Sequence, residues 1–254
     1  MLRSLQRMFR PATALAILAG VACSSGGTTD PEPTELRLLV VALVRNDISP
    51  ENRLEGAVAF FIDRDAVRLL PAEARIVGPT TWSMDSSAPG VVPGYYYHKA
   101  PSIRPGDAWK LEATVFGPDT TIVVESEFEI VPSQFVVRGP AQHPASQPLE
   151  IEWDAVPDAE FFTVAAGSGY EIELPGGTMT HTIPASAFAG ITPGVAIEIE
   201  VTAFNNFFVT IPTGISTLND PDAIADRFIQ RDNVLGANGT FGAATSVGYM
   251  VTLQ

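Results

Sequence analysis

The sequence predicts an all-β protein made of two tandem β-sandwiches. Three observations predict this fold class: runs in which apolar and polar residues alternate, frequent turn residues, and an internal repeat. The chain has 254 residues, and its 21 Gly and 21 Pro interrupt it too often for long helices. This length is sufficient for two domains that each bury a core of their own.

The charge and the cysteine content exclude several classes of protein. The chain carries 15 Lys and Arg against 29 Asp and Glu, a formal net charge of -14. Neutralisation of phosphates requires clustered Lys and Arg, so this excess of acid argues against nucleic-acid binding. The single cysteine excludes a disulfide framework and a zinc site built from cysteines.

Residues 1–22 predict a signal peptide. Three arginines precede the apolar stretch 12–22, which ends in small residues. This stretch is shorter than the roughly 20 apolar residues that span a bilayer. A basic region, a short apolar region and small residues before a cleavage point are typical of a secretory signal. We therefore expect the mature chain to begin outside the cytoplasm.

The residues Gly20-Val21-Ala22-Cys23 resemble the lipobox of bacterial lipoproteins. This resemblance implies that the thiol of Cys23 receives a diacylglycerol and that the mature protein carries acyl chains such as palmitate. Gly20 departs from the pattern, which usually has Leu there. Ser24 after the cysteine implies sorting to the outer membrane of the bacterial cell envelope. The alternative is a secreted protein cleaved near Ala22, with Cys23 as a free thiol.

Residues 23–34 predict a polar, flexible tether between the lipid and the folded body. Loss of the leader removes three arginines and no acids, which leaves 12 basic and 29 acidic residues. An acidic body repels anionic headgroups, so the predicted membrane attachment depends on the lipid alone.

Alternating patterns predict the strands that follow the tether. In Leu149–Trp153 the apolar residues share one face, and in 124–130 the acids lie opposite Phe128 and Ile130. A period of two over such lengths is typical of half-buried strands. Their separation by turn residues favours antiparallel sandwiches over βαβ units.

An internal repeat divides the body into two units. Residues 105–116 (PGDAWKLEATVF) align with residues 193–204 (PGVAIEIEVTAF) at six identical positions, with an offset of 88 residues. In both segments a Pro-Gly turn opens a strand with alternating inward residues. The offset fits an immunoglobulin-like sandwich, which takes about 100 residues. We predict sandwiches over residues 35–132 and 133–254.

The second unit resembles a fibronectin type III domain over residues 147–211. Residues 150–164 resemble the early strands of that family, with Trp153 as the core tryptophan, and residues 191–197 resemble its Leu-x-Pro-Gly-x-x-Tyr corner. Ile197 replaces the tyrosine. The whole layout also resembles a family of uncharacterised two-domain outer-membrane lipoproteins, known as a domain of unknown function; residues 233–242 carry part of this resemblance.

The C-terminal part predicts a short helix and a terminal hairpin. Asp220 is a candidate N-cap before a helix that extends to Ile229. Asn238-Gly239 is a hairpin signal, and residues 247–253 predict the last strand. The segment 204–208 (FNNFF) holds more apolar surface than one strand face can bury, which predicts a seam between the units or with a partner.

Motifs for chemistry are missing from the sequence. It contains no nucleophile elbow, dinucleotide fingerprint or P-loop, so we predict neither catalytic residues nor a cofactor. The three histidines lack metal-site spacing, and we predict no metal site. Tyr96, within Tyr95-Tyr96-Tyr97, is a candidate for holding a sugar or peptide, although aromatic residues more commonly fill sandwich cores.

We interpret the chain as a non-enzymatic, envelope-anchored lipoprotein that acts as a binding or scaffold module. Its expected partners are the membrane, through the lipid, and a protein or glycan. One alternative is a ligand-capture accessory subunit of an outer-membrane uptake system, with Tyr96 in contact with a sugar or peptide. A second alternative is a hydrolase that uses surface carboxylates, which requires two acids facing each other in a cleft.

Overall fold

The computed structural model describes residues 38–47, 56–63, 68–85, 95–98, 103–117, 120–167, 169–206 and 233–254. The predicted signal peptide, tether and helix after Asp220, together with Cys23, lie outside these residues. Within them the protein is built from strands and one short 3-10 helix, η1 (Ala185–Phe188). The predicted all-β class is therefore confirmed.

The strands form three sheets. The nine-stranded sheet contains β1 (Leu38–Asp47), β2 (Gly56–Asp63), β3 (Arg68–Leu69), β6 (Tyr95–His98), β11 (Gln142–His143), β13 (Phe161–Ala166), β14 (Tyr170–Pro175), β16 (Ala196–Asn205) and β18 (Asn238–Leu253). The six-stranded sheet contains β4 (Ala72–Val77), β5 (Thr81–Ser83), β7 (Ala108–Phe116), β8 (Thr121–Ser126), β9 (Glu129–Ile130) and β17 (Val234–Leu235). The three-stranded sheet contains β10 (Val137–Arg138), β12 (Leu149–Trp153) and β15 (Thr180–Ile183).

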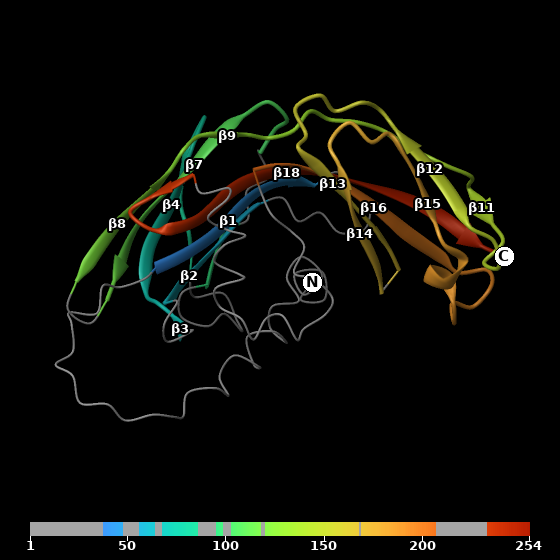
Figure 1. The fold of residues 1–254 in the computed structure, drawn as a ribbon, viewed down its shortest axis with the longest axis horizontal. Coiled ribbons are helices and arrows are strands. Elements are labelled where there is room, and N and C mark those ends of the chain that lie inside the picture. The colour runs from blue at the N-terminus through green and yellow to red at the C-terminus, as the bar shows by residue number, and fades with distance from the viewer. Residues whose placement is uncertain are drawn as a thin grey trace.

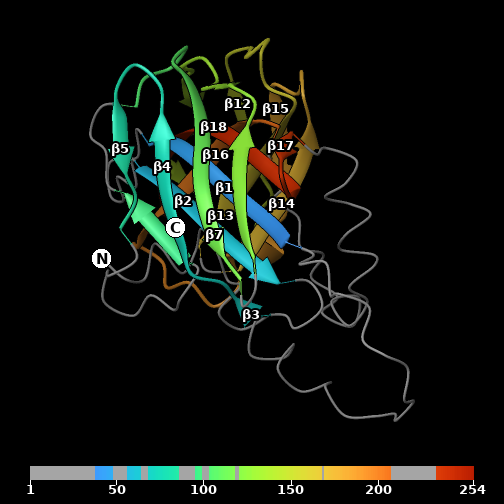
Figure 2. The same ribbon diagram turned by 90° about the vertical axis from the view of Figure 1, so that its left-hand side faces the viewer.

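Both smaller sheets pack on the nine-stranded sheet, and each encloses a core with it (Figure 1). Figure 2 views the first unit from its end, with β4 and β7 in front of β1 and β2. The first core, under the six-stranded sheet, has as its largest members Phe61, Ile76, Trp109, Leu111 and Phe241. The second core, under the three-stranded sheet, contains Trp153 and Phe135 together with the fully buried Phe162, Phe188 and Ile199.

The strand β18 belongs to both units. Its first half pairs in parallel with β1, from Asn238 to Ser246. From Ala243 to Thr252 it pairs antiparallel with β16, so four residues are hydrogen-bonded on both edges. The order β14-β13-β16-β18-β1-β2-β3 is therefore one continuous sheet, in which β18 is the link between the units.

Side-chain alternation places one face of β18 against both cores. Phe241 and Ala243 lie in the first core, and Val251 and Leu253 lie in the second. All four have odd numbers, as expected for a strand whose residues alternate between faces. The same face of one strand thus contributes to two separate hydrophobic clusters.

The internal repeat corresponds to two equivalent strands, β7 and β16. Each follows a Pro-Gly turn whose glycine has a positive φ, 84° for Gly106 and 87° for Gly194. Glycine adopts this conformation without the steric cost of a Cβ atom. The inward residues of both strands are buried as predicted, but β7 lies in the six-stranded sheet and β16 in the nine-stranded sheet.

The end of the chain differs from the predicted layout in two respects. Val234 and Phe241, within the range assigned to the second unit, lie in the first core because the chain returns to β1. The chain reverses between β17 and β18 at Gly236, two residues before the expected turn. Asn238 and Gly239 instead open β18, where Gly239 pairs with Val40.

We predict that Gly239→Ala destabilises the protein by about 2–3 kcal/mol, because of steric overlap and backbone strain. A Cβ atom at Gly239 would lie 1.9 Å from the carbonyl oxygen of Val40, and φ is +153°. Urea unfolding followed by tryptophan fluorescence measures this loss. The matched control is Gly169→Ala, where no atom lies within 4 Å of the added methyl group. Equal stability of the two variants would contradict the close contact between β1 and β18.

Candidate functional site

Two site residues were predicted from the sequence, Cys23 and Tyr96, and the backbone of only one of them is described. Cys23 lies outside the described residues. Tyr96 lies on β6, where its backbone pairs with Ala59 of β2. The side chain of Tyr96 is outside the described structure, so its ligand-binding role stays a prediction.

A buried carboxylate at the seam between the units is the centre of the best-defined polar cluster. The Oε1 atom of Glu129, on β9, accepts hydrogen bonds from Nδ2 of Asn206 (2.9 Å) and Nδ2 of Asn233 (2.7 Å). Asn233 also binds the backbone of Phe241 through both ends of its side-chain amide, at 2.8 and 2.9 Å. These contacts join β9, the end of β16 and the start of β18. We call these three residues the Glu129 cluster.

The Glu129 cluster holds both ends of a long connection. Asn206 is the last described residue after β16, and Asn233 is the first described residue before β17. The φ angle of Asn206 is +48°, a left-handed conformation that asparagine tolerates better than most residues. Its carbonyl accepts a hydrogen bond of 2.7 Å from Thr240. One carboxylate therefore links the last described residue before position 207 to the first described residue after position 232.

The environment of Glu129 favours its protonated form. Burial raises the pKa of Glu129 above its ordinary value of 4.5, and the carboxylates of Glu160 and Glu127 act in the same direction. The hydrogen bonds from Asn206 and Asn233 oppose this shift. Desolvation is the largest cause, so the net direction is upward.

In the described part of residues 204–208, the contact with the first unit is made by asparagines and not by the apolar surface from which the seam was predicted. Asn205 donates a hydrogen bond of 3.2 Å to the carbonyl of Ile130 in the first unit. Phe204 is buried and stacks on Phe161, with ring centroids 5.0 Å apart. Residues 207 and 208 lie outside the described structure.

A second polar cluster crosses β18 on the face turned away from both cores. The guanidinium of Arg45, on β1, lies 2.8 Å from Oε1 of Glu200 on β16 and 3.3 Å from Oδ2 of Asp47. The same Glu200 oxygen accepts a hydrogen bond from Thr202, whose hydroxyl lies 2.7 Å from that of Ser246. The ion pair thus connects the two neighbours of β18.

Small side chains on β18 allow Arg45 to reach Glu200. Arg45 pairs with Ala244, and Glu200 pairs with Gly248, so the ion pair spans the width of one strand. The residues on this face of β18 between positions 242 and 248 are Gly242, Ala244, Ser246 and Gly248. Sequence reasoning missed this pair, although the run of small residues at alternate positions was a readable signal.

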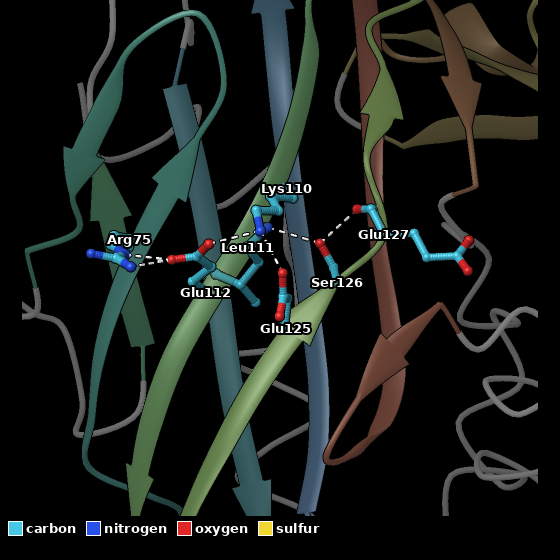
Figure 3. Close-up of polar contacts among 7 residues, drawn as sticks. All are labelled: Arg75, Lys110, Leu111, Glu112, Glu125, Ser126 and Glu127. Atoms are coloured by element: carbon cyan, nitrogen blue, oxygen red, sulfur yellow. Dashed lines mark hydrogen bonds and ion pairs between the residues drawn. The ribbon is translucent and has the colours of Figure 1, made fainter.

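Charged side chains form a ladder on the outward face of the six-stranded sheet (Figure 3). Nε of Arg75 on β4 lies 2.6 Å from Glu112 on β7, and Nζ of Lys110 lies 2.8 Å from the other oxygen of Glu112. Lys110 also binds Glu125 on β8 and lies 5.4 Å from the ring centroid of Phe128. The hydrogen bond from Lys110 lowers the pKa of Glu112. The carboxylates are thus neutralised by the cations between them.

The hydroxyl of Ser126 continues the β7–β8 ladder where the strands separate. Its Oγ accepts a hydrogen bond of 2.8 Å from the backbone N–H of Leu111 and donates one of 2.8 Å to the carbonyl of Glu127 (Figure 3). A buried N–H without a partner is costly, and the serine satisfies it. β8 can therefore end here, and Ser126 pairs with Val234 of β17.

A tyrosine and a histidine connect the outer strands of the second unit. The hydroxyl of Tyr170 on β14 lies 2.7 Å from Nε2 of His181 on β15. Partial burial lowers the pKa of His181 and raises that of Tyr170. The neutral forms are favoured, which fits a structural hydrogen bond between two sheets.

The described residues offer little for catalysis or metal binding. No group of three or more His, Cys, Asp or Glu among them is placed to hold a metal ion. A shallow hollow on β10 and β12 is lined by Arg138, Gly139, Glu150, Ile151 and Glu152. Its two glutamates are neighbours on one sheet face and do not face each other across a cleft.

No helix in the described part of the chain is long and apolar enough to cross a membrane.

Comparisons with known proteins give no family. No family model matches the chain, and none of the curated proteins matches it. The resemblance to an outer-membrane lipoprotein family therefore remains a prediction.

Two chicken proteins are among the similar solved structures. The FN1–FN3 domains of CNTN1 match with 13% identity and a TM-score of 0.23, over 64% of this chain and 63% of that chain. A two fibronectin type III domain segment of tenascin matches with 8% identity and a TM-score of 0.23, over 58% of this chain and 83% of that chain. The chain thus covers less than two thirds of the CNTN1 structure. At these TM-scores the fold class rests on the strand pairing described above.

We predict that Glu129→Gln changes the pH dependence of stability. Because the pKa of Glu129 is raised, the folded state binds a proton more readily than the unfolded state. The contribution of Glu129 to the free energy of unfolding therefore falls as the pH rises from 4.5 through the raised pKa, and it is constant above that. The difference between wild type and Glu129→Gln should follow this curve in urea unfolding at a series of pH values.

The control for this prediction is Glu150→Gln, which replaces an exposed carboxylate on β12 that is not among the groups shifting the pKa of Glu129. Its stability relative to the wild type should vary less with pH than that of Glu129→Gln. A flat difference for Glu129→Gln over this range would show that the carboxylate is solvated and not held in the seam.

Proposed function

We propose that this protein is a non-enzymatic lipoprotein of the bacterial cell envelope that serves as a binding or scaffold module. A lipid on Cys23 holds it to the outer membrane, and its two units present surfaces to a protein or glycan partner. The observation that carries this proposal is the shared strand β18, which makes one continuous sheet from two sandwiches.

The joint between the units supports a scaffold role. Domains linked only by a flexible segment move relative to each other, whereas a shared sheet limits this motion through backbone hydrogen bonds. Two further contacts reinforce the joint: the Glu129 cluster and the ion pair between Arg45 and Glu200. A stiff body of this kind keeps a binding surface at a constant distance from its anchor.

The polar groups of the described residues support a non-enzymatic role. The carboxylates of Glu112 and Glu125 share Lys110, and those of Asp47 and Glu200 share Arg45. A hydrolase of the paired-acid type needs one protonated and one ionised acid that face a substrate. The carboxylates described here are arranged around cations that link strands, which is a structural arrangement.

The location of the protein follows from its lipid in this proposal. The mature chain carries 12 basic and 29 acidic residues, so a negatively charged membrane surface repels the folded body. Two or more acyl chains give stable attachment without help from the protein surface. The lipid therefore determines the location, and the sandwiches are left free to bind a partner.

Metabolic labelling with an alkyne fatty acid in a bacterial host tests the anchor. We expect the label on the wild-type protein in the membrane fraction. Cys23→Ser should abolish the label and release the protein, because Cys23 is the only cysteine of the chain. Ser25→Ala, close to the attachment point, is the matched control and should keep the label.

Chemical crosslinking in the same cells tests the binding role. We expect a discrete adduct for the wild type, and its loss for Cys23→Ser, which no longer reaches the membrane. Unchanged labelling of Cys23→Ser would refute the anchor. A correctly lipidated protein without any specific adduct would refute the binding role.

A further inference from the structure

Three exposed apolar residues lie together on the outward face of the six-stranded sheet. Phe116 ends β7, Val123 lies on β8 and Leu235 lies on β17, with exposed fractions of 40%, 71% and 69%. Val123 lies opposite Thr114, and Leu235 lies opposite Glu125. Phe116 and Leu235 are therefore each diagonal neighbours of Val123, at about 7–8 Å between backbones. We call these three residues the apolar strip.

The apolar strip lies at the end of the molecule where the described chain begins. Leu38, the first residue of β1, pairs with Asp63 at the end of β2. The next strand, β3, pairs with this end of β2 and leads to Pro71. The carbonyl of Pro71 accepts a hydrogen bond of 3.0 Å from the N–H of Phe116. A short series of backbone contacts thus connects Leu38, the first described residue, to Phe116 of the apolar strip.

A second series of contacts leads to the same place. Leu39 pairs with Asn238 at the start of β18. The preceding turn holds Gly236 so close to the carbonyl oxygen of Val123 that a Cβ atom would lie 2.1 Å from it. Leu235 precedes this turn directly. Figure 1 shows the starts of β1 and β18 at one end of the molecule, and Figure 2 has that end toward the viewer.

The distance from the proposed lipid to this end of the molecule is limited by the chain. Cys23 precedes Leu38 by 15 residues. Even a fully extended chain of this length spans at most about 50 Å, and a coil spans about 20 Å on average. A tether of this length therefore allows the apolar strip, at this end of the described structure, to reach the bilayer.

We propose that the apolar strip rests on the lipid bilayer and orients the protein, with the first unit against the membrane. This inference rests on the proposed lipid at Cys23. Three side chains bury too little apolar area to bind a membrane alone, but the tether keeps them at a high local concentration beside it. The lipid provides attachment, and the strip selects which end of the body faces the membrane.

The chemistry of the contact is apolar and not electrostatic. The mature chain has an excess of 17 acidic residues, 29 against 12, so anionic headgroups repel it. The apolar strip fits the boundary between headgroups and acyl chains of a zwitterionic membrane, such as phosphatidylcholine. The contact should therefore persist at high salt and weaken when anionic lipid is added.

Single labelled cysteines in the lipidated protein test this inference. The acylated Cys23 has no free thiol, so Val123→Cys or Leu235→Cys provides one reactive site for an environment-sensitive fluorophore. The control is Val195→Cys, which replaces a valine of 44% exposure whose carbonyl binds the N–H of Leu253 at the other end of β18. The 16 residues of β18 place it about 50 Å away.

In phosphatidylcholine vesicles that contain a nitroxide lipid, we expect a blue shift and quenching for labels at 123 and 235, and neither for the label at 195. Equal emission at the three sites, with mass spectrometry showing the acylated N-terminus, would overturn the inference and leave the anchor intact. A blue shift without quenching that grows with protein concentration would assign the strip to a second copy of the chain, which also overturns it. A missing acyl group would instead refute the proposed function.

Discussion

The double pairing of β18 is the constraint on which the rest of the structure depends. This strand pairs with β1 at the start of the described chain and with β16 of the second unit, and residues 243–246 do both at once. Strands distant in sequence must come together before this pairing is possible, which costs loop-closure entropy. Burial of one strand face in two cores offsets that cost. The two sandwiches are consequently parts of one sheet.

Polar residues at the joint follow from this constraint. On one face of β18, Thr245 donates a hydrogen bond of 2.6 Å to the carbonyl of Pro132, in the segment between the two units. The opposite face of β18 carries the Arg45–Glu200 pair. Apolar residues would fill the same space without specifying a register, whereas these hydrogen bonds form in one alignment only. Ion pairs of this kind add little net stability when buried, so their contribution is to fix how β1, β18 and β16 align.

The sequence was sufficient to predict the fold class and many strands, because a period of two is a local signal. Leu149, Ile151 and Trp153 are buried in alternation as expected. The prediction for 124–130 was wrong: the strand ends at Ser126, and after the break Glu129 is buried while Phe128 and Ile130 are exposed. The sharing of β18 could not be predicted, since its pairing with β1 joins residues about 200 positions apart in the sequence. Asn238-Gly239 shows how a local signal can mislead. The pair is typical of a turn, but here Gly239 lies within a strand and allows β1 to approach closely. The Glu129 cluster is likewise a product of topology, because its asparagines meet only when β9 and β18 are assembled.

The shared strand also sets the distance between the two ends of the molecule. Leu38 and the start of β18 lie at one end, and Leu253, bound to Val195, lies at the other. A strand of 16 residues is about 50 Å long, so the second unit lies at a set distance from the point where the chain enters the body. A tether alone gives a bound partner a broad range of heights above a membrane. A continuous sheet narrows that range, because its length is maintained by backbone hydrogen bonds. In the proposed anchored module, the joint between the sandwiches would therefore matter as much as any residue on the contact surface.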